Sequence, residues 1–176
     1  MIETGRLFLR PFETGDSKSL YKLNLDPEVL AFTGDVPFES VHQARQFIRS
    51  YDQYRKYGVG RMAAIEKEKA EFIGWCGLKY SAGNDENDPG EYDIGFRFFK
   101  SKWMQGFATE SARACIGYGF TELSLKSIVG RAMKDNEASI RVLEKIGLRF
   151  FKRFDFEGRE GVIYRIDRHR YHAIKN

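Results

Sequence analysis

One segment of the chain combines residues that could hold a phosphate group. Residues 103–110 (WMQGFATE) follow a β-prone run over 92–99 and open an amphipathic run over 111–123, which predicts a strand, a tight loop and a helix. A helix N-terminus leaves its first backbone N–H groups unpaired and carries about half a positive charge, and Gly106 lets a pyrophosphate approach the backbone closely. The alternative is an ordinary helix start with Thr109 as its N-cap.

Two carboxylates lie upstream of this loop. Glu91 and Asp93 are two residues apart on the predicted strand and therefore share one face, opposite Ile94 and Phe96. A carboxylate beside a ligand cleft could act as a general base, accepting a proton directly or through water. Surface carboxylates at the solvated start of a strand explain the pair equally well.

A second candidate helix start lies downstream of the loop. Asn136 precedes a predicted helix over 139–146, which Gly147 stops. With Ser139 three residues further on, Asn136 could cap this helix whether or not a ligand binds.

Four segments of the chain recur in the same order in one protein family. They are Thr4–Arg10, Ile94–Phe96, the loop at 103–110 and Asp135–Ser139. With them the chain resembles the GNAT-type acetyl-CoA-dependent N-acetyltransferases, and among these the branch that includes the ribosomal-protein N-terminal acetyltransferases. The resemblance covers nearly the whole chain.

The resemblance implies an α+β fold: a mixed, mostly antiparallel sheet of about seven strands, splayed between the fourth and fifth, with about four helices. It implies acetyl-CoA as cosubstrate, with its pyrophosphate on the loop at 104–109 and its pantetheine arm in the splay. The cofactor-binding residues that it implies are Phe96, Phe98, Phe99, Met104, Gln105, Gly106, Phe107, Ala108, Thr109, Asn136 and Ser139. The catalytic residues that it implies are Glu91, Asp93 and Ser139.

Two positions depart from the family pattern. Leu143 stands where many members have a tyrosine that protonates the departing thiolate, which leaves Ser139, a water molecule or direct thiolate release. Met104 stands where glycine is usual, and a positive φ there would strain a methionine. Because of Leu143, a second functional class stays open: a non-catalytic module on the same fold that binds acyl-CoA or another protein.

The expected acceptor is a primary amine that attacks acetyl-CoA directly in a ternary complex. A ribosomal or other protein N-terminus fits the branch resemblance, and a small amine such as a polyamine, amino acid or aminoglycoside is the alternative. The acidic pair Glu91 and Asp93 would suit any cationic acceptor. A homodimer is left open.

Composition bounds the remaining possibilities. The 176 residues predict a single N-acetyltransferase domain over 1–176, and apolar runs too short for a membrane span or a signal peptide predict a cytoplasmic protein. The net charge of +4 falls well short of a nucleic-acid footprint, and a nucleic-acid binder is supported only by this charge and the arginine-rich end. Cys76 and Cys115 are predicted to be core residues, and His169 and His172 belong to a solvated basic tail, so no metal site is predicted.

Periodicity predicts the remaining elements. We expect strands over 6–12, 61–66, 72–80, 91–99, 127–133, 149–156 and 162–166, and helices over 16–24, 39–57, 109–123 and 139–146, with a short turn at 27–32. The polar segment 81–90 is expected to be an exposed loop.

Overall fold

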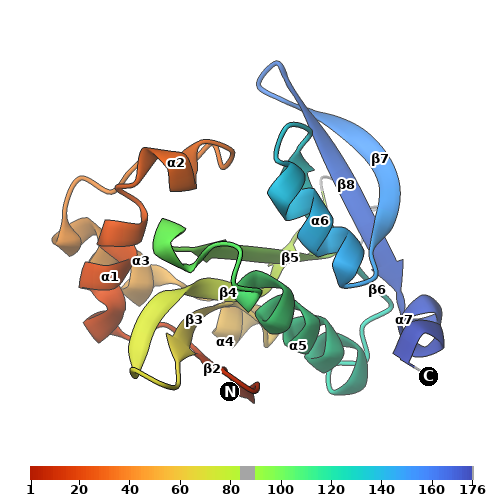
Figure 1. Cartoon of the computed structure of the whole chain (residues 1–176), viewed down its shortest axis with the longest axis horizontal. Helices are drawn as coiled ribbons and strands as arrows, with labels where there is room; N and C mark the ends of the chain where they lie inside the picture. The colour runs from red at the N-terminus through yellow and green to blue at the C-terminus, as the bar shows by residue number, and fades with distance from the viewer. Residues whose placement is uncertain (84–89, 176) are drawn as a thin grey trace.

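The computed structural model describes residues 1–83 and 90–175, which form one eight-stranded sheet with helices on both faces (Figure 1). The strand order is β1-β2-β3-β4-β5-β6-β8-β7. The strands are β1 (Ile2–Glu3), β2 (Leu7–Arg10), β3 (Arg61–Glu66), β4 (Glu71–Ser81), β5 (Glu91–Phe98), β6 (Ser127–Met133), β7 (Arg149–Phe156) and β8 (Arg159–Asp167). The predicted α+β sheet is confirmed, with the short β1 as one strand more than expected.

The sheet opens between its fifth and sixth strands in chain order. All neighbouring strands pair antiparallel except β5 and β6, which run parallel and pair only at Asp93 with Val129 and at Ile94 with Gly130. Beyond Ile94 the two strands diverge toward the end of β5. This is the splay that the family resemblance implied.

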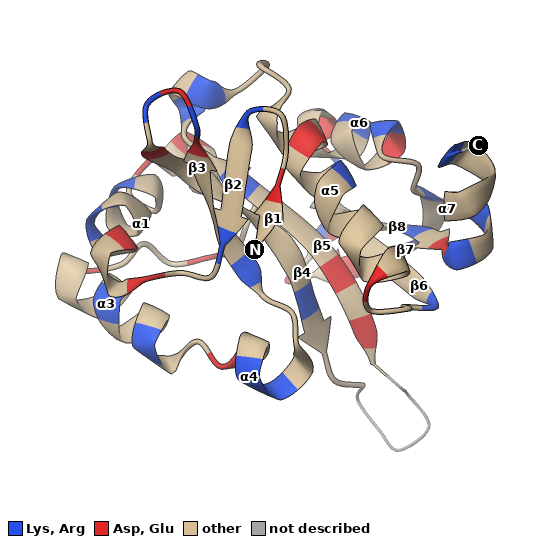
Figure 2. Cartoon of the chain, turned by 90° about the horizontal axis from the view of Figure 1, so that it is seen from below, with Lys and Arg blue, Asp and Glu red and all other residues tan. Residues whose placement is uncertain are grey.

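Helices cover both faces of the sheet. They are α1 (Ser17–Leu23), α2 (Pro27–Leu30), α3 (Val41–Ser50), α4 (Gln53–Tyr57), α5 (Phe107–Thr121), α6 (Glu137–Lys145) and α7 (Arg168–Lys175). In Figure 2, α1, α3 and α4 lie on one side of the sheet and α5 and α6 on the other. The predicted inward face of α5 is confirmed, because Ala112, Cys115, Ile116 and Phe120 are all buried.

The single helix predicted over 39–57 is wrong. The chain breaks at Tyr51, whose φ of −71° and ψ of 99° are extended, so that α3 and α4 are separate. The break turns two phenols onto the start of β3: the Tyr51 hydroxyl accepts the N–H of Arg61 at 2.8 Å, and the Tyr54 hydroxyl donates to the Arg61 carbonyl oxygen. Tertiary hydrogen bonds thus outweigh one continuous helix.

The two ends of the chain also differ from expectation. The predicted basic tail forms α7, whose Tyr171 ring stacks on Phe120 of α5 at a centroid distance of 4.9 Å. The predicted exposed loop at 81–90 lies mostly outside the described residues. Within the described ranges, no helix is both long and apolar enough to span a membrane.

Both cysteines are core residues, as predicted. Cys76 of β4 and Cys115 of α5 are buried, and their sulfur atoms lie 3.9 Å apart across the sheet–helix interface. In the described part of the chain no three His, Cys, Asp or Glu side chains gather into a group that could hold a metal ion.

Candidate active site

The loop between β5 and α5 starts the helix on a glycine. Gly106 is the N-cap of α5 in the left-handed region, with φ of 82°, and has no side chain to accept a hydrogen bond. The first bond of the helix runs from the Glu110 N–H to the Gly106 carbonyl oxygen at 3.0 Å. The N–H groups of Phe107, Ala108 and Thr109 therefore have no partner within the helix, as the first turn of any helix requires.

This geometry corrects the alternative reading of the loop. Thr109 is the third residue of α5 and not its N-cap, because the helix begins at Phe107. An uncapped helix start keeps its donors and its partial positive charge available to an external anion. The loop fits a pyrophosphate for this reason.

Met104 carries the strain expected of a residue in a glycine position. Its φ is 59°, and its side chain is 94% exposed, so no packing offsets the left-handed conformation. With Gly106 two residues later also at positive φ, the chain turns twice before α5 begins.

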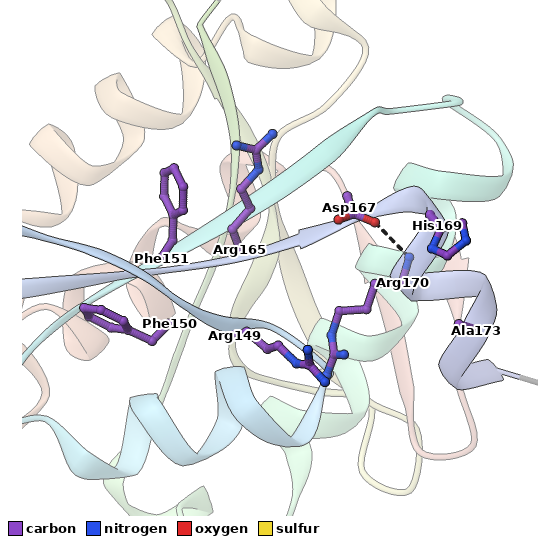
Figure 3. A pocket seen from close by; sticks show the side chains of 8 residues that line it. All are labelled: Arg149, Phe150, Phe151, Arg165, Asp167, His169, Arg170 and Ala173. Carbon is purple, nitrogen blue, oxygen red and sulfur yellow. Dashed lines mark hydrogen bonds between the residues drawn. The ribbon is translucent and has the colours of Figure 1, made fainter.

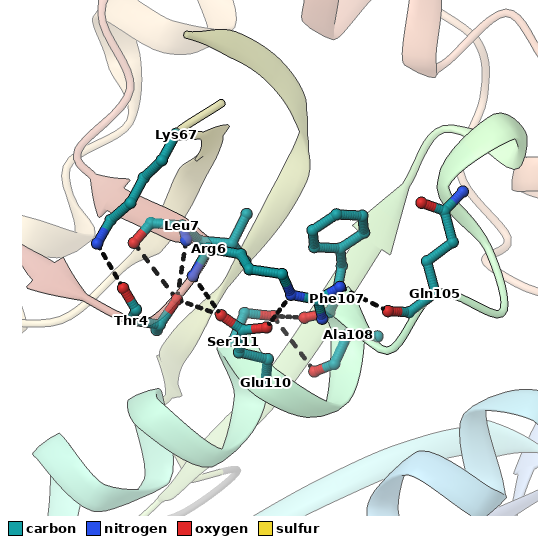
Figure 4. A network of polar contacts seen from close by, with 9 residues as sticks. All are labelled: Thr4, Arg6, Leu7, Lys67, Gln105, Phe107, Ala108, Glu110 and Ser111. Carbon is teal, nitrogen blue, oxygen red and sulfur yellow. Dashed lines mark hydrogen bonds and ion pairs between the residues drawn. The ribbon is translucent and has the colours of Figure 1, made fainter. Parts of the chain in front are cut away.

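A polar network ties the loop to the N-terminal strand region (Figure 4). The Glu110 carboxylate accepts hydrogen bonds from Thr4 Oγ1 at 2.6 Å, Arg6 N at 2.8 Å and Arg6 Nε at 2.7 Å. Arg6 Nη1 also donates to the Gln105 carbonyl oxygen at 2.9 Å, and the guanidinium carbon lies 4.3 Å from the centre of the Phe107 ring. Arg6 thus fixes the residues on both sides of Gly106.

The charge state of Glu110 follows from this network. Burial raises the pKa of its carboxyl, but the hydrogen bonds from Thr4 and Arg6 outweigh burial and place the pKa below the ordinary value of 4.5. The carboxylate is therefore ionised whenever the loop is assembled at neutral pH.

The edge of β5 that faces β6 provides backbone groups beside the loop. The Phe99 N–H donates to a carbonyl oxygen of β4 at 3.0 Å, so alternation along the strand turns the N–H groups of Phe98 and Phe96 toward β6. Pairing with β6 stops at Ile94, which leaves these two N–H groups on the open edge. The Phe98 carbonyl oxygen accepts the indole N–H of Trp103 at 2.9 Å. Phe99 was also predicted to contact the cofactor, but its N–H group is already hydrogen-bonded within the sheet and faces away from β6.

The start of α6 lies at the same end of the sheet as the loop, because β5 and β6 run parallel. Asn136 is the N-cap of α6, and its Oδ1 accepts the Ser139 N–H at 3.1 Å. The predicted cap is confirmed. Both side chains are half-buried, so the Asn136 amide and the Ser139 hydroxyl remain partly accessible.

The predicted carboxylates lie within a cluster of arginines. Asp93 is buried and forms ion pairs with Arg61 through Oδ1 and with Arg131 through Oδ2, the latter at 3.0 Å. Arg131 also pairs with Glu91, whose side chain is 35% exposed. Gly95 makes room for the Arg61 guanidinium, since a Cβ atom there would lie 2.5 Å from its central carbon. Two positive and two negative charges therefore balance on this face.

Sequence reasoning found the carboxylates but missed their partners. Arg61 is the first residue of β3, and Arg131 lies within β6. They are about 30 and 40 residues from Asp93 in the chain, respectively. Only the glycine between Ile94 and Phe96 hinted that a large side chain crosses β5 there. Arg6 and Glu110 were within recognised segments, but nothing in the sequence paired them.

Comparison with known proteins places this geometry in a family. The model of the acetyltransferase (GNAT) domain matches residues 6–149. The chain belongs to the GNAT acetyltransferase family. Among GNAT relatives, it is 35% identical to the uncharacterized N-acetyltransferase p20 of Bacillus licheniformis over 146 residues, which cover 82% of this chain and 80% of that protein.

Two solved acetyltransferase structures share the fold across almost their whole length. A GNAT-family acetyltransferase from Bacillus anthracis superposes with a TM-score of 0.79 at 25% identity and covers 96% of this chain and 98% of its own. An aminoglycoside acetyltransferase in complex with coenzyme A superposes with a TM-score of 0.79 at 19% identity and covers 97% of this chain and 99% of its own. The latter likeness shows the fold alone.

The chain is an N-acetyltransferase, and solved structures of the same fold hold coenzyme A or acetyl-CoA. The uncapped start of α5 and the open edge of β5 fit the anionic and amide-bearing parts of such a molecule. Leu143 of α6 is only 1% exposed and packs against Gly130 of β6, so this position contributes packing and no hydroxyl group.

Proposed function

We propose that this enzyme transfers the acetyl group of acetyl-CoA to a primary amine by direct attack in a ternary complex. The observation that supports the proposal most is the glycine-capped start of α5 beside the open edge of β5. These two features support the proposal, because the first would offer N–H donors to a pyrophosphate and the second would offer N–H donors to amide and carbonyl oxygens. No nucleophilic enzyme residue is required.

The chain would hold acetyl-CoA chiefly through its backbone. Residues 104–109 would bind the pyrophosphate, and the N–H groups of Phe96 and Phe98 would bind the pantetheine arm and the thioester oxygen. Asn136 and Ser139 would contact the arm from the start of α6. When bound, acetyl-CoA supplies an activated acyl group with a good leaving thiolate.

Glu91 is the stronger candidate for the general base. Asp93 has both carboxylate oxygens in ion pairs with guanidinium groups, so it must lose one of them to accept a proton. Among the described residues Glu91 forms an ion pair only with Arg131, and it is more exposed than Asp93, so it can reach an incoming ammonium group or a water molecule. We therefore assign to Asp93 the positioning of Arg61 and Arg131, and to Glu91 the removal of the proton from the acceptor ammonium group.

The departing thiolate needs no tyrosine in this chain. Leu143 is buried in the core, which leaves the Ser139 hydroxyl, a water molecule or direct release. A simple thiol has a pKa of about 8.5, so thiolate release near neutral pH is not prohibitive.

We propose a protein N-terminus as the acceptor, in keeping with the ribosomal-protein acetyltransferase branch. Arg61 and Arg131 balance the charges of Glu91 and Asp93, so this face gains little from an acceptor with several positive charges. A single amine on a peptide fits a balanced face better than a polyamine or an aminoglycoside does.

The experiment that tests the proposal measures thiol release from acetyl-CoA with a panel of acceptors: peptides with different N-terminal residues, single amino acids, a polyamine and an aminoglycoside. We expect turnover with at least one peptide, and intersecting double-reciprocal plots, as a ternary complex requires. Parallel plots would instead indicate a covalent enzyme intermediate and would contradict direct attack.

The cofactor assignment needs its own variants. Gly106→Val should weaken acetyl-CoA binding at least tenfold, about 1.4 kcal/mol, because a branched side chain blocks approach to the loop. Gly158→Val is the matched control, since Gly158 has a φ of 79° against 82° at Gly106 and no atom within 4 Å of its Cβ direction. Equal acetyl-CoA affinity in the two folded variants, measured by calorimetry, would overturn the assignment.

A further inference from the structure

A cleft lies at the other end of β6 from residues 104–109, the proposed pyrophosphate site, which is called the phosphate loop below. A cavity of about 480 Å³ opens between the start of β7, the end of β8 and α7 (Figure 3). The residues of this cleft that matter here are Arg149, Phe150, Phe151, Arg165, Asp167 and Arg170. The cleft has the size of a small-molecule site.

The cleft carries a net positive charge. Arg149, Arg165 and Arg170 have no ion pair to a carboxylate in the described ranges, and the Asp167 carboxylate caps α7 by accepting the backbone N–H of Arg170 at 2.8 Å. Residues 149–175 contain eight Lys and Arg against four Asp and Glu, a surplus equal to the net charge of +4 of the whole chain. Figure 3 shows the side chains of Arg149 and Arg170 pointing toward one another, whereas Arg165 points to the other side of the strands. Two guanidinium groups that converge without a carboxylate partner repel one another, and an anion relieves that repulsion.

Two exposed aromatic rings stand beside these arginines. Phe150 is 54% exposed and Phe151 is 46% exposed, although both belong to a sheet. The Phe150 ring meets Tyr164 edge-on at a centroid distance of 6.1 Å, and the Arg165 guanidinium lies 5.3 Å from the centre of the Phe151 ring. These contacts hold the rings in place while leaving ring surface open to a ligand.

The charges of β7 argue against a second copy of the chain as the occupant. β7 is an edge strand, so two copies could pair through it. Symmetric antiparallel pairing over the full length of β7 would set Lys152 of one copy opposite Arg153 of the other, and like charges across strands are destabilising. An inorganic anion alone would leave the two phenylalanine rings uncovered.

We propose that this cleft binds a nucleotide, with its phosphate between Arg149 and Arg170 and its base against the exposed face of Phe150, which lies on the same side of β7 as Arg149 (Figure 3). Arginine clusters recognise phosphate, and aromatic rings stack bases without regard to sequence. A free nucleotide and an RNA strand share this chemistry, and the test below separates them.

The cleft is separate from the phosphate loop. Ser127 at the start of β6 pairs with Asp167 beside the cleft, whereas Met133 at its end pairs with Gly161. The phosphate loop follows the end of β5, which runs parallel to β6. The length of β6, about 20 Å at roughly 3.3 Å per residue, therefore lies between the two sites.

Calorimetry of the full chain with 5′-AMP tests the proposal, with inorganic phosphate, adenosine and a single-stranded RNA pentamer as comparison probes. Arg149→Ala and Phe150→Ala should each weaken 5′-AMP binding at least tenfold, and both side chains are exposed enough for the variants to fold. Arg153→Ala, on the same strand but outside the cleft, should bind like the wild type. Thermal melts verify folding.

Each outcome decides the proposal. Tighter binding of 5′-AMP than of phosphate or adenosine supports a nucleotide site, and tighter binding of the pentamer than of 5′-AMP identifies RNA as the source. Phosphate binding as tightly as 5′-AMP overturns the assignment, as does undiminished 5′-AMP binding in the Arg149 and Phe150 variants. Loss of 5′-AMP binding in Gly106→Val also overturns it, because the nucleotide would then occupy the phosphate loop.

Discussion

Replacing Glu110 with glutamine should loosen the phosphate loop, although Glu110 itself lies just outside residues 104–109. Glutamine keeps one acceptor oxygen for Thr4 and the Arg6 backbone, but it turns an N–H₂ group toward Arg6 Nε, which now donates to the carboxylate at 2.7 Å. Among the described contacts, the Arg6 guanidinium would then keep only those to the Gln105 carbonyl oxygen and the Phe107 ring.

The size of the expected effect depends on how exposed the Arg6 and Glu110 side chains are. Hydrogen bonds to a charged group contribute about 1.5–3 kcal/mol, but the Arg6 side chain is 48% exposed against 22% for Glu110, so solvent screens part of the interaction. We expect Glu110→Gln to lower the free energy of unfolding by about 1–2 kcal/mol. A misplaced loop should weaken acetyl-CoA binding about three- to tenfold, roughly 0.7–1.4 kcal/mol.

The effect should also depend on pH. Because the pKa of Glu110 is lower in the folded protein than its ordinary value of 4.5, its stabilising contribution is present above that value and is lost as pH falls through the folded pKa. The difference in stability between wild type and variant should therefore be full at pH 7 and shrink below about pH 4.5.

Denaturant unfolding and acetyl-CoA calorimetry measure both effects. Glu122→Gln is the control, since it removes the same charge at the far end of α5, where the Glu122 carboxylate contacts, among the described residues, just the Thr121 hydroxyl. If Glu110→Gln matches Glu122→Gln in stability and in acetyl-CoA affinity, the network does not position the loop and the reasoning is wrong.

Three further predictions concern single residues. Met104→Gly should raise the free energy of unfolding by about 0.5–1 kcal/mol, because it relieves an exposed residue at positive φ, and a decrease in denaturant unfolding would contradict the strain. Asn136→Asp should keep the cap of α6 but lose the amide donor, so stability should hold while acetyl-CoA affinity falls; equal affinity would reduce Asn136 to a cap. Glu91→Gln should bind acetyl-CoA normally and lose about 10² in turnover near neutral pH, with recovery at higher pH as the amine deprotonates unaided. A raised apparent KM with unchanged maximal rate would instead make Glu91 an electrostatic attractor.

Local patterns predicted most of the elements because they depend on a few neighbouring residues. Alternation placed β6 at Ser127–Met133 and β3 at Arg61–Glu66, and Gly106 marked the turn before α5. The errors came where distant groups compete with local preference. Two phenols of the 39–57 segment bond to Arg61, so the helix breaks at Tyr51.

The sequence by itself determined the strand–loop–helix unit, the family and the strained position of Met104, because backbone sterics and short motifs are local properties. Only the tertiary structure decided what each charge faces. Asp93 proved to be an arginine-paired carboxylate, and Glu110 proved to be the anchor of Arg6, 104 residues away. Such pairs depend on how strands and helices pack, since side chains remote in the chain meet only after the sheet has set their register.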